Sequence, residues 1–188
     1  NGPHEDKMGI RANTTTTMNF DNVRVPAANV LGEVGKGFYI AMESLNGGRI
    51  GIASQALGIA QGAFERSVEY AKQRKAFGKP IAELQAIQIK IAEMATKVEA
   101  ARLLVYKAAT MKDKHERFVK EAAQAKLLAS KFAVEVALEA IQVHGGYGYV
   151  REYQVERLLR DSKITEIYEG TSEIQHIVIA RELIKDLQ

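Results

Sequence analysis

The residues best suited to chemistry lie near the carboxyl end of the chain, in residues 164–175. There a carboxylate, Glu169, stands between an aromatic residue, Tyr168, and Gly170, just before a predicted helix start. A carboxylate held against apolar surface at a helix mouth is a candidate general base, because desolvation makes it hold a proton more strongly. The glycine lets a ligand approach the backbone. The ordinary alternative is a solvated loop residue ahead of a capped helix.

Two further segments have the composition of ligand-binding loops. Residues 74–81 carry Arg74, whose guanidinium can hold a phosphate through two hydrogen bonds, and Phe77, which can pack on a ring. A basic helix end followed by a Gly-Lys-Pro turn explains this segment at least as well. Residues 142–149 contain three glycines, and paired glycines expose backbone N–H groups to phosphate oxygens. No strand precedes these glycines, so neither a Rossmann nor a P-loop site is indicated, and a plain helix stop remains open.

The composition excludes several classes of site. The 188 residues include no Cys, which excludes disulfides, iron–sulfur clusters, thiolate zinc sites and cysteine nucleophiles. The four His show no paired spacing on one helix face, so no metal site is expected. The net charge of +3 comes from Lys and Arg scattered among Asp and Glu, which argues against nucleic acid as a partner. No apolar run is long enough to predict a membrane span.

The opening of the chain differs in character from the rest. The first 33 residues are rich in Thr, Asn and Val, and residues 14–20 and 22–26 have the composition of strands. Pro26 would end the second strand. Because two strands are not stable alone in water, we expect residues 1–33 to be the trailing strands and linker of a β-domain, or a flap on the helices.

Residues 34–188 are expected to form a helical domain. Two of its long helices show apolar residues at steps of three and four, which marks a buried face. Thr171 or Ser172 can cap the last helix. The glycines of the first long helix are expected to allow close helix crossing, with room for a ligand as an equal alternative at Gly47 and Gly48. The expected helices cover residues 38–74, 84–108, 118–143, 154–161 and 172–186. Long helices joined by short turns favour an antiparallel four-helix bundle, so the predicted fold is mainly α, preceded by a short β segment.

Six segments, taken in order, resemble the C-terminal part of the acyl-CoA dehydrogenases. They read KMGIR, FDNVRVP, GGRIGIA, RKAFGKPI, QVHGGYGY and ITEIYEGTSEIQ, at residues 7–11, 20–26, 47–53, 74–81, 142–149 and 164–175. The likeness covers nearly the whole chain and is strongest to the short-chain, butyryl-CoA type. It implies that the chain is a C-terminal fragment holding the last strands of a middle β-domain and the bundle that follows.

The resemblance also implies a reaction, the FAD-dependent α,β-dehydrogenation of a short-chain acyl-CoA to the 2-enoyl-CoA. Glu169 would remove the α-proton while the β-hydride passes to the flavin. Hydrogen bonds from the backbone N–H of Glu169 and from a ribityl hydroxyl would stabilise the developing enolate. Relatives that carry the base elsewhere place it at the position of Gly48, where this chain has no carboxylate. Glu169 is therefore the one candidate base that the resemblance implies.

The implied site residues form a cofactor set and a substrate set. Positions that hold FAD, several of them across a subunit interface, are matched by Arg74, Gln85, Gln142, Gly145, Gly146, Thr171 and Glu173, with Phe77 as a candidate ring contact. For the substrate, Asn46 and Arg49 would meet the CoA portion, Tyr168 would wall the acyl pocket, and Gly170 would let the thioester lie close. Two residues depart from the family pattern: Asn46 stands where aspartate is usual, and His176 where arginine is usual.

The resemblance further implies partners and a location. These are an electron-transferring flavoprotein as acceptor, a homotetramer, and either the bacterial cytoplasm or the mitochondrial matrix. Two alternatives stay open. One is a non-catalytic helical oligomerisation domain or fragment, since the β-domain that packs on the flavin is missing. The other is an acyl-CoA oxidase-like activity with oxygen as acceptor.

Overall fold

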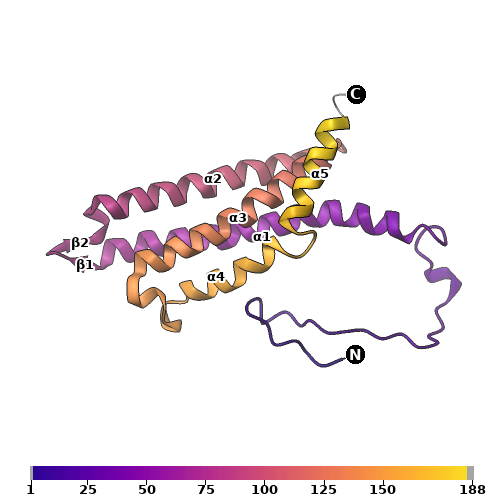
Figure 1. Ribbon diagram of the computed structural model, residues 1–188, viewed down its shortest axis with the longest axis horizontal. Helices are drawn as coiled ribbons and strands as arrows, with labels where there is room; N and C mark the ends of the chain where they lie inside the picture. Colours follow the sequence, from indigo (N-terminus) through magenta and orange to yellow (C-terminus); the bar gives the residue numbers. More distant parts are fainter. Residues whose placement is uncertain (1, 186–188) are drawn as a thin grey trace.

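The computed structural model describes residues 2–185 and is dominated by three long helices. These are α1 (Gly37–Gln73), α2 (Gln85–Asp113) and α3 (Val119–His144). A hairpin of two-residue strands, β1 (Lys75–Ala76) and β2 (Lys79–Pro80), joins α1 to α2, and residues 114–118 join α2 to α3. The short connections make successive helices antiparallel, and the three lie side by side in Figure 1.

Two shorter helices complete the domain. Helix α4 (Val155–Lys163) turns back from the end of α3 and packs on α1 and α3 as a short fourth member of the bundle. Helix α5 (Ser172–Lys185) crosses the other end of α3 (Figure 1). The predicted mainly α, four-helix architecture is therefore confirmed, with helix ends within a few residues of those expected. The expected end of the last helix at Asp186 lies outside the described residues.

Alanine lines the contact between the long helices. In α1 the fully buried apolar residues are all alanines, and α3 presents a matching row. These rows are Ala53, Ala56, Ala60, Ala63 and Ala71 in α1, and Ala122, Ala123, Ala125, Ala129, Ala133, Ala137 and Ala140 in α3. Methyl side chains let two helix backbones approach closely while still excluding water.

The glycines of α1 contribute less to this contact than expected. A Cβ added at Gly51 or Gly58 would meet nothing within 4 Å, and one at Gly62 would meet only the side chain of Arg66, one turn away. The prediction that Gly58 and Gly62 allow close helix crossing is therefore wrong for this chain, because the alanines already make the close approach.

The strands expected in residues 1–33 are absent from residues 2–33, which form an extended arm with one 3₁₀ turn at Ala27–Asn29. Only two backbone hydrogen bonds pair its halves, from Gly2 N to Thr17 O (2.8 Å) and from Glu5 N to Thr15 O (2.9 Å). β-Propensity describes side chains that pack on a half-buried sheet, and residues 18–31 are exposed here. Without partner strands the Thr- and Val-rich composition does not produce a sheet.

One part of the arm does contact the helices. The Ile10 N–H donates to Asp161 Oδ1 of α4 (2.7 Å), and Arg160 Nη1 donates to the Met8 carbonyl (3.0 Å). A Cβ at Gly9 would overlap the backbone carbonyl of Arg160, so only glycine permits this approach. Within residues 2–185, no helix has the length and apolar character needed to cross a bilayer.

Candidate functional site

The segment between α4 and α5 carries Glu169 and is attached to the bundle by buried hydrogen bonds. Ser130 Oγ of α3 donates to the Thr165 carbonyl (2.8 Å), and Thr165 Oγ1 donates to the Ser162 carbonyl (2.7 Å). Thr165 is fully buried. After this anchor the backbone turns sharply, with φ of 56° at Glu169 and 94° at Gly170. A left-handed conformation is unfavourable for a glutamate, so its surroundings must hold it there.

The turn directs the Glu169 carboxylate against α1. A Cβ added at Gly48 would lie 2.5 Å from Glu169 Oε2, so the absence of a side chain at Gly48 makes room for this carboxylate. Oε2 is buried and has no hydrogen-bond partner among residues 2–185. A buried acceptor without a partner is unusual and marks a position of interest, and a free carboxylate oxygen is what a general base requires.

Two cations lie near this carboxylate. Lys126 of α3 is fully buried, and burial lowers the pKa of its ammonium to about 8, against attraction from Glu166, Glu169 and Glu173. Arg49 of α1 is 7% exposed, and burial lowers its pKa while the charge of Glu169 raises it. The site therefore places two buried cationic side chains, one from α1 and one from α3, near the Glu169 carboxylate.

The remaining predicted substrate residues make hydrogen bonds at the same end of the bundle as Glu169. Arg49 Nη1 donates to Asn46 Oδ1 (2.9 Å), so the asparagine keeps the acceptor that the usual aspartate would offer. The Tyr168 hydroxyl donates to Gln55 of α1, and burial raises the pKa of this phenol. The structure thus brings Asn46, Arg49, Tyr168, Glu169 and Gly170 to the same end of the bundle.

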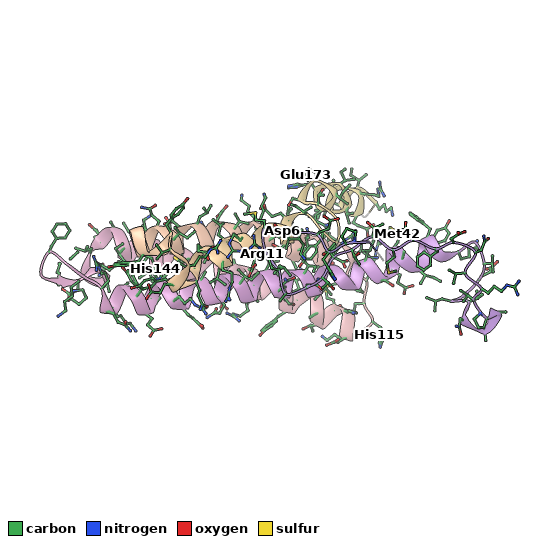
Figure 2. The ribbon with its side chains drawn as sticks, turned by 90° about the horizontal axis from the view of Figure 1, so that it is seen from below. Asp6, Arg11, Met42, His115, His144 and Glu173 are labelled. Atoms are coloured by element: carbon green, nitrogen blue, oxygen red, sulfur yellow. The ribbon has the colours of Figure 1, made fainter. Side chains whose placement is uncertain are left out.

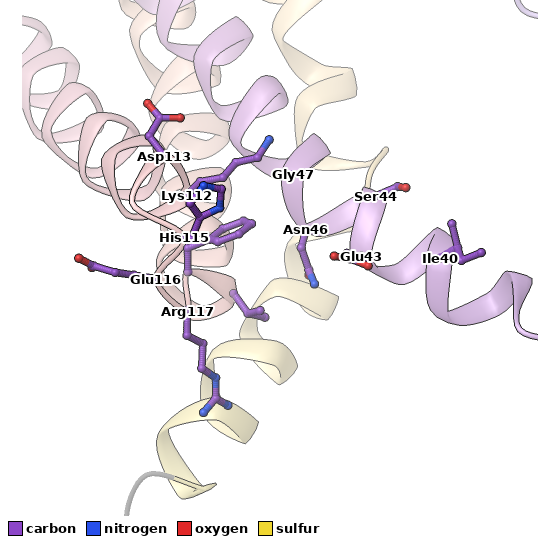
Figure 3. A pocket seen from close by; sticks show the side chains of 12 residues that line it. Ile40, Glu43, Ser44, Asn46, Gly47, Lys112, Asp113, His115, Glu116 and Arg117 are labelled. Carbon is purple, nitrogen blue, oxygen red and sulfur yellow. The ribbon is translucent and has the colours of Figure 1, made fainter. Parts of the chain in front are cut away.

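A pocket of about 910 Å³ opens beside Asn46, between the start of α1 and the α2–α3 turn (Figure 3). Side chains of both charges line it, among them Glu43, Lys112 and His115. Lys112 reaches towards α1, since a Cβ at Gly47 would lie 3.1 Å from its Nζ. Gly47 therefore leaves space that a lysine ammonium partly fills.

A second cavity, of about 530 Å³, lies at the hairpin end of the bundle and collects four of the predicted cofactor residues, Arg74, Gln142, Gly145 and Gly146. The Arg74 guanidinium lies 5.5 Å from the ring centroid of Tyr147. Gly145 has φ of 59°, and a Cβ at either glycine would meet nothing within 4 Å. The cavity thus offers open backbone next to a guanidinium.

Two stacked rings, Tyr70 and His144, line this cavity, and Tyr153 packs beside them. Tyr70 of α1 stacks on His144 at 4.2 Å between ring centroids, and Tyr153 packs edge-on against Tyr70 at 5.8 Å. His144 Nδ1 lies 2.7 Å from the Ala140 carbonyl, and burial lowers the pKa of this imidazole. The sequence pattern did not single out this ring cluster, because its members come from three segments.

The other predicted cofactor residues lie elsewhere. Phe77 sits at the hairpin tip with 91% of its surface exposed, and Gln85 begins α2. Thr171 and Glu173 belong to the Glu169 end, where Thr171 Oγ1 accepts a long hydrogen bond (3.5 Å) from the Ile174 N–H and caps α5. Figure 2 shows His144 and Glu173 well separated along the bundle. Within one chain, the predicted cofactor set therefore falls into two groups, one at the hairpin end, which includes Phe77 and Gln85, and one at the Glu169 end.

Two residues of the Glu169 site were missed from the sequence, Gln55 and Lys126. A signal for Lys126 existed: it follows Ala122 by four residues, on a face of α3 that consists mostly of alanines. Gln55 gave none, because its role depends on which helix faces Tyr168. His176, the second departure from the family pattern, is exposed on α5.

Comparison with known proteins shows which family the chain belongs to. Residues 35–184 match the family model described as acyl-CoA dehydrogenase, C-terminal domain. The chain is 55% identical to the mitochondrial short-chain specific acyl-CoA dehydrogenase of Bos taurus, over 98% of this chain and 45% of that protein. It is 57% identical to acryloyl-CoA reductase (NADH) of Anaerotignum propionicum, over 98% of this chain and 47% of that protein.

Among solved structures, butyryl-CoA dehydrogenase from Megasphaera elsdenii superposes with a TM-score of 0.96 at 54% identity, over 97% of this chain and 48% of that one. The chain thus spans about half the length of the relatives it matches. On the family match, the identity and the shared fold, the chain belongs to the acyl-CoA dehydrogenase family, as its C-terminal helical domain.

Proposed function

We propose that this chain is the C-terminal half of an FAD-dependent acyl-CoA dehydrogenase subunit, in which Glu169 removes the α-proton of a short-chain acyl-CoA. The observation that carries the proposal is the buried, unpartnered Oε2 of Glu169, held on a left-handed backbone beside Gly48. The products are the 2-enoyl-CoA and the reduced flavin. The butyryl-CoA and short-chain relatives support the short acyl group.

In this mechanism the chain's own residues position the substrate and move the proton. Glu169 Oε2 takes the proton from the α-carbon, and the buried side chains of Arg49 and Lys126 lie near this carboxylate. Tyr168, fixed by its hydrogen bond to Gln55, walls the acyl group. Gly170 carries no side chain that would block the thioester. When bound, FAD would accept the hydride that leaves the β-carbon, a reaction that protein side chains cannot perform.

The cavity at the hairpin end fits a phosphate-bearing cofactor. Arg74 supplies a planar cation for a pyrophosphate, and Gly145 and Gly146 leave their backbone open to it. The separation of this group from Thr171 and Glu173 supports a cofactor that bridges two subunits. The proposal therefore includes a homo-oligomer, a tetramer by family, with an electron-transferring flavoprotein as acceptor and the bacterial cytoplasm or mitochondrial matrix as location.

The test is Glu169→Gln in the complete subunit, with flavin reduction by butyryl-CoA followed anaerobically. We expect the variant to bind FAD and to reduce it at least about 10³-fold more slowly, since amides accept protons poorly. The control is Glu139→Gln, because Glu139 lies on α3 outside the Glu169 loop and pairs with Lys90 Nζ (2.6 Å). Retained turnover in the Glu169 variant would remove this residue from the mechanism.

A second candidate function is the reverse reaction at the same site, the reduction of a 2-enoyl-CoA. The acryloyl-CoA reductase relative favours it, because a reductase must deliver a proton to the carbon from which a dehydrogenase removes one. Incubating the reduced enzyme with a 2-enoyl-CoA separates the two functions: net saturation of the substrate at the expense of NADH identifies a reductase. Oxygen consumption with butyryl-CoA would instead identify an oxidase. The last alternative is tested by adding butyryl-CoA to this chain alone, supplemented with FAD. If the absorption band of the oxidised flavin does not change, the chain is a non-catalytic fragment.

A further inference from the structure

We propose that Lys126 is a positioning residue for the base: its buried ammonium holds the Gly170 carbonyl and so keeps Glu169 directed at the substrate. This inference rests on the proposed function of Glu169. Lys126 belongs to α3 and is 44 residues distant in sequence from the carbonyl that it contacts.

The environment of Lys126 is unusual for a lysine. Its exposed fraction is 0%, and it is among the largest fully buried side chains. Lysine is almost never fully buried unless its charge is paired. Within residues 2–185, however, no carboxylate oxygen lies within 4 Å of its Nζ. Its one hydrogen bond is the donation to the Gly170 carbonyl at 2.7 Å.

The same carbonyl receives a second donor from α5. Gln175 Nε2 lies 2.8 Å from the Gly170 oxygen, and Gln175 is itself fully buried. The carbonyl is thus held between α3 and α5. Because the peptide bond is planar, fixing this oxygen restricts the backbone of Gly170, whose φ of 94° follows directly on the left-handed Glu169.

The charges around Lys126 explain why an ammonium serves here. Burial lowers its pKa to about 8, Glu166, Glu169 and Glu173 favour the charged form, and Arg49 opposes it. At neutral pH the ammonium is therefore charged and makes a charge-assisted hydrogen bond, which is stronger than a neutral one. A strong donor is needed because the left-handed glutamate would otherwise relax to an ordinary conformation.

The experiment replaces Lys126 with Met in the complete subunit, since methionine fills a similar volume without a donor. We expect FAD binding to persist, kcat with butyryl-CoA to fall about 100-fold, and KM to change little, because a displacement near 1 Å is enough for such a loss. A crystal structure of the variant should show Glu169 out of the left-handed region. Gln175→Met, which removes the other donor, should shift both readouts in the same direction.

The matched control is Lys131→Met on the same helix, where the lysine side chain is 62% exposed and lies 3.9 Å from Glu135. It should leave kcat and the Glu169 backbone unchanged. The proposal is overturned if Lys126→Met keeps kcat within threefold, or if Glu169 stays left-handed in its crystal structure. The structural readout does not depend on the role of Glu169, so the inference and the proposed function can fail separately.

Discussion

The contact between Gly48 and Glu169 leads to a prediction in which stability and activity change in opposite directions. In Gly48→Ala, the new Cβ would lie 2.5 Å from Oε2, whereas ordinary contact begins near 3.4 Å, so the carboxylate must retreat by about 0.9 Å. The far end of a glutamate side chain can make this shift cheaply. At the same time, alanine in a helix interior is more stable than glycine by about 1 kcal/mol.

We therefore expect Gly48→Ala to unfold at a higher urea concentration while its kcat falls about 100-fold. Urea unfolding of this chain measures the first effect. Stopped-flow reduction of the flavin in the complete subunit, with butyryl-CoA and without oxygen, measures the second. Substrate affinity should change little, because the side chain that moves is the proposed base and not a residue proposed to bind CoA.

The control is Gly58→Ala in the same helix, where the new methyl group meets nothing within 4 Å. It should show the gain in stability without the loss of kcat. If Gly48→Ala retains kcat within threefold of the wild type, the carboxylate beside α1 is not the group that removes the proton. If both variants lose activity equally, the effect belongs to α1 as a whole, and the reasoning from the contact is wrong.

Two further predictions concern stability and the arm. The pKa of Lys126 is near 10.5 in the unfolded chain and about 8 in the folded chain, so between these pH values the unfolded state binds one more proton. The free energy of unfolding of the wild type should therefore rise by about 3 kcal/mol from pH 8 to pH 10.5, relative to that of Lys126→Met. Urea titrations of both proteins at the two pH values measure this difference. Gly9→Ala should detach the arm from the Arg160 carbonyl and speed tryptic cleavage at Arg11 about tenfold, since overpacking costs about 1–3 kcal/mol. Gly37→Ala, with open space around it, is the control, and an unchanged cleavage rate in Gly9→Ala would contradict the packing argument.

The helices could be predicted from the sequence because their signals are local. Apolar steps of three and four set the buried faces of α2 and α3, and the prolines lie outside the helix interiors. The arm could not be predicted in the same way. Its Thr- and Val-rich residues have strand propensity, but a strand needs neighbouring strands, and propensity alone does not supply them.

The residues of the site also divide into those that the sequence shows together and those that meet only in the folded structure. Glu169, Tyr168 and Gly170 are consecutive, so the sequence shows them together, although the role of Glu169 as base remains a prediction. The partners that fix them, Gln55 and Lys126, come from two other helices and meet the loop only after packing. Nothing in the spacing of residues identifies such contacts in advance, beyond a lysine on an apolar face.

The alanine rows of α1 and α3 have a consequence for the precision of the site. Alanine has no side-chain torsion beyond its methyl rotation, so this contact has no alternative rotamers and loses no rotamer entropy on folding. Along these rows the helices therefore approach to a distance set by backbone and methyl dimensions, and Ile50, Leu57 and Val136 pack in the same core. Gly48 lies on one of these helices, and the anchors of the Glu169 loop lie on the other. The space in front of the carboxylate thus lies between two helices whose closest contacts involve side chains without rotamers.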